Sequence, residues 1–108
     1  MEVLNRVVHT DKYNDLMERL NTEHDLFYYM TLAKTPKEVY EDFGRIRFYE
    51  CVYEYFRYKE NIKADYISAC LREEYIFSSL YELYLKYEHL NVGSWEQVEE
   101  LLNALAYR

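Results

Sequence analysis

Residues 48–56, with the sequence Phe-Tyr-Glu-Cys-Val-Tyr-Glu-Tyr-Phe, decide the fold class of this chain. At about 100° per residue, the aromatic and aliphatic side chains of this stretch cover more than half of a helical circumference. These side chains belong to Phe48, Tyr49, Val52, Tyr53, Tyr55 and Phe56. A helix that is apolar on most sides is buried on most sides, so the stretch predicts the central helix of an all-α protein. The remaining face is a polar stripe typical of weak ion pairs in water, made of Arg47, Glu50, Glu54 and Arg57.

The start of this central helix is marked by residues 35–38. Thr35 is a favourable cap, and Pro36 suits the first helical position because it has no N–H to leave unsatisfied. Glu38, at the third position, completes a capping box with Thr35. The central helix, second in the chain, is therefore predicted from Pro36 to about Lys59.

Helical spacing also predicts an element before the central helix. We expect a first helix over about residues 11–32, capped by Thr10. Its apolar face consists of Tyr13, Leu16, Met17, Leu20 and Phe27. Residues 3–8 are compatible with a short strand or with a helical turn.

Two or three further helices are expected after the central one. The third runs from Ile62 to about Arg72, and a fourth follows it, although a single long, bent helix is an open alternative. The inward side chains are Ile67, Cys70 and Leu71 in the third and Ile76, Leu80, Leu83, Tyr84 and Tyr87 in the fourth. The pattern breaks at residues 91–93, and Ser-Trp-Glu-Gln at 94–97 is a capping box that predicts the last helix. Its inward residues are Trp95, Val98, Leu101, Leu102 and Leu105.

The composition suits a single helical domain over residues 1–108, which contain only two Gly and one Pro. So few turn formers cannot supply the hairpins of an all-β domain, and we expect a compact bundle of four to five helices. No stretch approaches the roughly 18 apolar residues that a membrane span needs. The N-terminus lacks the cationic start and apolar run of a signal peptide, so we expect a cytoplasmic protein with no membrane partner.

The net charge of −7 argues against direct binding of nucleic acid, which needs clustered Lys and Arg. The charge is distributed unevenly. Residues 1–63 contain twelve acids and ten bases, whereas residues 64–108 contain eight acids and three bases, a net charge of −5. The C-terminal part is therefore expected to present an acidic surface.

Nothing in the sequence indicates an enzyme, a metal site or a cofactor. None of the three histidines, His9, His24 and His89, follows a Glu by three residues, so the ligand motif of di-iron bundles is missing. His24 falls on the apolar face of the first helix, where a hydrogen-bonded core role is more common than metal ligation. Cys51 and Cys70 have no metal-site spacing and are interpreted as small buried side chains.

Tyrosine is the unusual feature, with 14 residues in a chain that is 19% aromatic. A bundle of this size cannot bury all of them fully, and exposed Tyr is enriched in protein interfaces. Opposite the packing face of the fourth helix, Tyr81 and Leu85 are expected to point into solvent, flanked by Glu74 and Glu88. The last helix adds three outward carboxylates, Glu96, Glu99 and Glu100. These seven residues are the predicted binding site for a protein with a basic surface.

Four segments resemble a family of short, acidic, helical proteins of unknown function from bacteria, phages and mobile elements. They are Leu-Met-Glu-Arg-Leu at 16–20, Pro-Lys-Glu-Val at 36–39, Leu-Tyr-Glu-Leu-Tyr-Leu at 80–85 and Trp-Glu-Gln-Val-Glu-Glu-Leu at 95–101. The resemblance implies no catalytic motif and a role as mobile-element cargo. Our leading hypothesis is a non-enzymatic binding protein, a phage-type inhibitor of a nucleic-acid-handling defence complex such as a CRISPR nuclease. The alternative is a structural or regulatory module that works as a homo-oligomer.

Overall fold

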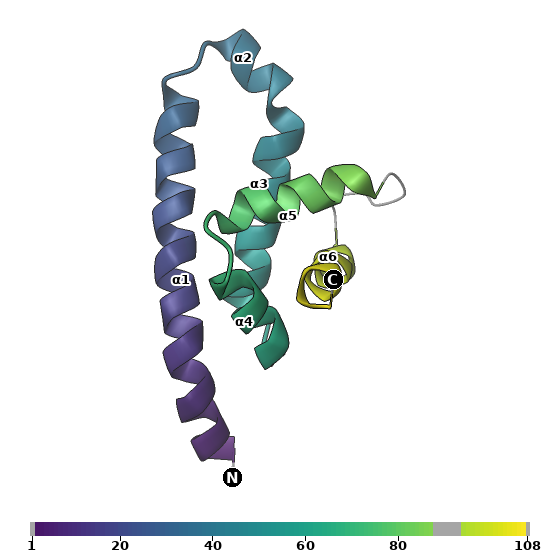
Figure 1. Cartoon of the computed structure of the whole chain (residues 1–108). Coiled ribbons are helices and arrows are strands. Elements are labelled where there is room, and N and C mark those ends of the chain that lie inside the picture. The colour runs from purple at the N-terminus through teal and green to yellow at the C-terminus, as the bar shows by residue number, and fades with distance from the viewer. Residues whose placement is uncertain (1, 88–93, 108) are drawn as a thin grey trace.

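Figure 1 shows the computed structural model of the chain, which describes residues 2–87 and 94–107, with side chains from residue 11 onward. All regular secondary structure among these residues is α-helical, and they form no strand. Its helices are α1 Glu2–Leu32, α2 Pro36–Glu41, α3 Phe43–Tyr58, α4 Ala64–Leu71, α5 Ile76–Lys86 and α6 Trp95–Ala106. The all-α class is therefore confirmed, although the described residues form six helices rather than four or five.

The additional helix arises because the predicted helix from Pro36 is interrupted at Asp42. Its start is as predicted, since the Thr35 side chain accepts a hydrogen bond from the Glu38 amide and the Glu38 carboxylate accepts one from the Thr35 amide. At Asp42 the backbone leaves the helical region, with φ −91° and ψ 7°. The Asp42 carboxylate pairs with Lys34, which lies before α2, so the two ends of this short helix are tied together.

Two further boundaries differ from expectation. The first helix begins at Glu2, so Thr10 lies inside α1 and does not cap it, and the segment at 3–8 is helical. The expected third and fourth helices are separate elements, because α4 ends at Leu71 and α5 begins at Ile76.

The central, mostly buried position predicted for this helix is confirmed for α3. In α3, all but one of the six predicted apolar side chains are buried, namely Phe48, Tyr49, Val52, Tyr55 and Phe56. The sixth, Tyr53, is half-buried and stacks on His24 of α1, with ring centroids 4.1 Å apart. Helices α1, α5 and α6 all contact α3, and in Figure 1 α5 crosses it while α1 runs alongside.

The start of α6 departs from its predicted capping box. The Ser94 side chain makes no capping hydrogen bond, and the Gln97 amide oxygen is buried without a hydrogen-bond partner in the described residues. Trp95, expected to face inward, is 39% exposed and meets the Tyr55 ring edge-on. The buried face of α6 otherwise matches the prediction, with Val98, Leu101, Leu102 and Leu105. The predicted break at 91–93 lies outside the described residues.

Candidate protein-binding surfaces

The two cysteines are free thiols held in their protonated form. Burial raises the pKa of both, that of Cys70 to about 12, so neither has the thiolate character of a reactive nucleophile. Within residues 2–87 and 94–107, no group of three or more His, Cys, Asp or Glu side chains is placed to hold a metal ion. In the same residues, no helix has the length and apolar character to cross a membrane.

Tyr81 does not point away from the core, so the predicted orientation of its side chain is wrong. The ring is half-buried, with its centroid 5.3 Å from that of Phe48 and 6.2 Å from that of Tyr49. The guanidinium of Arg45 lies 5.6 Å from the centre of the Tyr81 ring. Because α5 crosses α3, a face that the helical wheel assigns to solvent meets a second helix. Leu85, one turn further on, is 61% exposed.

The other predicted residues of this face are not gathered around Tyr81. The exposed Glu74 precedes the first turn of α5, whereas Leu85 lies in its last turn, so the two are at opposite ends of the helix. The main-chain carbonyl of Glu74 accepts a hydrogen bond from Arg19 at 3.0 Å. Glu88 lies outside the described residues.

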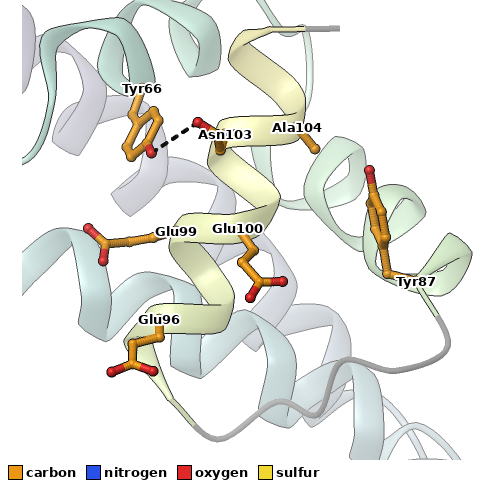
Figure 2. A pocket seen from close by; sticks show the side chains of 7 residues that line it. All are labelled: Tyr66, Tyr87, Glu96, Glu99, Glu100, Asn103 and Ala104. Atoms are coloured by element: carbon orange, nitrogen blue, oxygen red, sulfur yellow. Dashed lines mark hydrogen bonds between the residues drawn. The ribbon is translucent and has the colours of Figure 1, made fainter.

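The three predicted glutamates of α6, in contrast, lie together along one cleft. Figure 2 shows this cleft, which has a volume of about 510 Å³. It is lined by Tyr66, Tyr87, Glu96, Glu99, Glu100, Asn103 and Ala104. Tyr66 comes from α4 and Tyr87 directly follows α5, so three segments form the cleft. The sequence indicated the carboxylates, but not the two tyrosines, because helix periodicity does not say which helices lie beside α6.

The cleft is negatively charged and has aromatic walls. Glu99 is partly buried and accepts a hydrogen bond from the Tyr55 hydroxyl at 3.0 Å, while Glu96 and Glu100 are exposed. None of the seven lining residues is basic. One cation of the protein itself already lies next to Tyr66, since the Lys63 ammonium is 5.4 Å from the centre of the Tyr66 ring. Carboxylates beside tyrosine rings suit a Lys or Arg side chain, which can form ion pairs and cation–π contacts together.

A second surface was not predicted from the sequence. We call it the apolar tip, and it consists of Leu26, Tyr28, Tyr29, Met30, Leu32, Tyr40 and Phe43. All seven side chains are more than half exposed, Tyr40 most of all at 82%. In Figure 1, α2 and the adjoining ends of α1 and α3 extend beyond α5, where no other helix covers them. The sequence signal was the run at 26–30, whose consecutive apolar residues point to every side of a helix.

Comparison of the chain with protein-family models, curated proteins and solved structures finds no match. The function is therefore inferred from the chemistry of these two surfaces.

Proposed function

We propose that this protein is a non-enzymatic binding module that recognises a basic surface on another protein. The observation that carries this proposal is the cleft along α6, where Glu96, Glu99 and Glu100 lie with Tyr66 and Tyr87 around about 510 Å³. The surrounding chain adds to the effect, because residues 64–108 have a net charge of −5. A field of one sign attracts a partner of the opposite sign and excludes partners of like charge.

We assign the side chains of the cleft different roles in binding. Glu96 and Glu100 are exposed and free to meet a cation at the entrance. Glu99 is held in place by the Tyr55 hydroxyl, so its carboxylate keeps one orientation before the partner arrives. The half-buried Tyr87 offers contact area for the methylene groups of a Lys or Arg, whereas the ring of Tyr66 is buried and forms the floor of the cleft.

A partner rich in exposed Lys and Arg is typical of proteins that hold nucleic acid, since those residues neutralise phosphates. An acidic protein that occupies such a surface blocks the nucleic acid. We therefore include in the proposal the role of an inhibitor of a nucleic-acid-handling defence complex, such as a CRISPR nuclease, carried by a phage or mobile element. The support for this part is the negative charge of the cleft, and the origin in a phage or mobile element is carried over from the expectation based on the sequence.

The cleft is tested by titrating the isotope-labelled protein with a short peptide of alternating Arg and Gly, followed by NMR. We expect shift changes at Tyr66, Glu99 and Asn103, and affinity that weakens as salt is added. The double variant Glu96→Gln, Glu100→Gln should weaken binding at least tenfold, the range for loss of charge-assisted hydrogen bonds.

The matched control is Glu18→Gln combined with Glu82→Gln, which removes the same charge from exposed positions on α1 and α5. If both double variants weaken binding of the peptide equally, binding depends only on the net charge of the protein and the cleft is not a binding site. Shift changes spread over all acidic residues lead to the same conclusion.

A further inference from the structure

The apolar tip concentrates exposed hydrophobic surface at one end of the molecule. Of the twelve large hydrophobic side chains that are exposed among the described residues, seven lie between residues 26 and 43. In the last turns of α1, Leu26 and Tyr28 point to opposite sides of the helix, and the rings of Tyr28 and Tyr29 meet edge-on with centroids 6.0 Å apart. Phe27 packs against Tyr49 of α3, with ring centroids 4.3 Å apart. A helix that is apolar on all sides is normally packed against other elements on all sides. The last turns of α1 are packed only on the side of Phe27, against α3.

The exposed area is large for a monomer. At roughly 200 Å² for each large side chain and about 60% exposure, seven such side chains present about 800 Å². The largest apolar patch on a typical monomer is about 300–600 Å², and a standard interface buries about 800 Å² on each partner. The summed exposed area of the tip therefore reaches that of one side of a stable protein interface, and a partner has to surround the end of α1 and α2 to cover it.

The charges around the tip are balanced, unlike those of the rest of the chain. Residues 26–46 contain three bases and three acids, namely Lys34, Lys37, Arg45, Glu38, Glu41 and Asp42. The remaining residues carry the whole net charge of −7. Two copies of this chain repel each other wherever their acidic parts meet, but not where a neutral, apolar surface meets its equal.

We propose that the apolar tip is the interface between two copies of this chain. In a two-fold dimer the same patch is used on both copies, so the paired helices α1 and α3 of one tip pack beside those of the other. The resulting four-helix arrangement covers apolar side chains that a pair of helices leaves in water. A neutral surface gives no attraction to a strongly charged partner or to an anionic membrane, which needs clustered Lys and Arg. This inference uses a different surface from the acidic cleft and is independent of it.

The proposal is tested by sedimentation velocity of the full chain between about 1 and 200 µM, a range that includes weak interfaces of this size. We expect a monomer–dimer equilibrium that is unchanged or strengthened by added salt, because apolar burial is not screened. Leu26→Lys and Tyr29→Lys should each weaken the dimer at least tenfold. Both side chains are exposed, so circular dichroism and the melting temperature of the dilute monomer should remain unchanged.

The matched control is Leu85→Lys, since Leu85 is 61% exposed and Leu26 is 59% exposed, each within a helix. This control should leave the dimer intact. A chain that is monomeric at every concentration overturns the proposal, and so does a dimer that Leu85→Lys disrupts as much as Leu26→Lys. If the monomer instead binds neutral phosphatidylcholine vesicles and Leu26→Lys abolishes that binding, the occupant of the tip is a lipid surface and the proposal is also wrong. None of these outcomes affects the peptide titration, which tests the cleft.

Discussion

Arg19 and Glu23 lie one turn apart on α1, with their Nη2 and Oε2 atoms 3.9 Å apart, and together they cap the facing ends of α4 and α5. The Arg19 guanidinium donates to the carbonyl of Leu71, the last residue of α4, at 2.9 Å, and to the carbonyls of Glu73 and Glu74, which follow α4. The Glu23 carboxylate accepts from the first amides of α5, those of Ile76 at 2.9 Å and Phe77 at 3.1 Å. The helix dipole favours a positive charge at the C-terminal end of α4, where Arg19 lies, and a negative charge at the N-terminal end of α5, where Glu23 lies.

This arrangement predicts that Glu23→Ala destabilises the protein by about 1–2 kcal/mol, as expected for the loss of an N-terminal cap. The two amides at the start of α5 lose their acceptor, and Arg19 loses its ion-pair partner. Urea unfolding followed by circular dichroism measures the change. Glu18→Ala is the control, because Glu18 is exposed on the same helix, and it should stay within about 0.5 kcal/mol of the parent. Equal effects of both substitutions would contradict the capping role.

Because the Tyr81 ring is half-buried, its removal should affect the stability of the protein more than removal of an exposed tyrosine would. Tyr81→Ala should lower the free energy of unfolding by about 2 kcal/mol, since it removes ring contacts with Phe48 and Tyr49 and leaves Arg45 without one of its aromatic partners. Leu85→Ala, on the exposed side of the same helix, should change it by less than about 0.5 kcal/mol. Thermal unfolding of both variants measures these changes. If Tyr81→Ala is as stable as the parent, the side chain points into solvent, as the sequence predicted.

Tyr55 should make the fold sensitive to alkali. Burial, reinforced by the hydrogen bond to Glu99, raises the pKa of Tyr55 above its usual value of about 10. Above pH ~10 the unfolded chain loses this proton while the folded chain keeps it, so the free energy of unfolding falls as the pH rises. Tyr55→Phe cannot ionise, and its stability should decline less between pH ~9 and pH ~11.5 in urea titrations. Tyr13, Cys51 and Cys70, whose pKa values burial also raises, contribute to the decline that remains. So does Tyr107, whose pKa is raised by its hydrogen bond to Asp65. Identical pH profiles for parent and variant would refute this role.

The start of α2 should respond to acid. The hydrogen bond from the Thr35 amide lowers the pKa of Glu38, and the bond from Lys34 lowers that of Asp42. A lowered pKa means that the stabilisation is complete above pH ~4.5, the range of unfolded carboxyls, and is lost as the pH falls through the folded value. Amide exchange protection at Val39 should therefore decrease in acid before protection in α3 does. In Glu38→Gln the capping hydrogen bond persists without a titrating group, so this decrease should be smaller.

Helix formation and the central position of α3 were determined by the sequence alone, because both depend on local spacing. Every side of the stretch at 48–56 except one is apolar, and water disfavours that surface whatever surrounds it. The capping box at Thr35 is equally local, since its partners are three residues apart. In the same way, the carboxylates of α6 had to face outward, because the opposite face of that helix is apolar.

Only the tertiary structure decided where helices meet and which surfaces stay uncovered. The break between α4 and α5 depends on Arg19 and Glu23, which lie about fifty residues earlier in the chain, and no local pattern contains them. Tyr81 is half-buried because α5 crosses α3, and a helical wheel has no information about a crossing. The run at 26–30 is apolar on every side of the helix, yet all of its side chains except Phe27 are exposed, because α5 and α6 do not extend to cover it. Whether an apolar side chain is exposed depends on how far other helices extend over it, and the spacing of residues within one helix does not predict this.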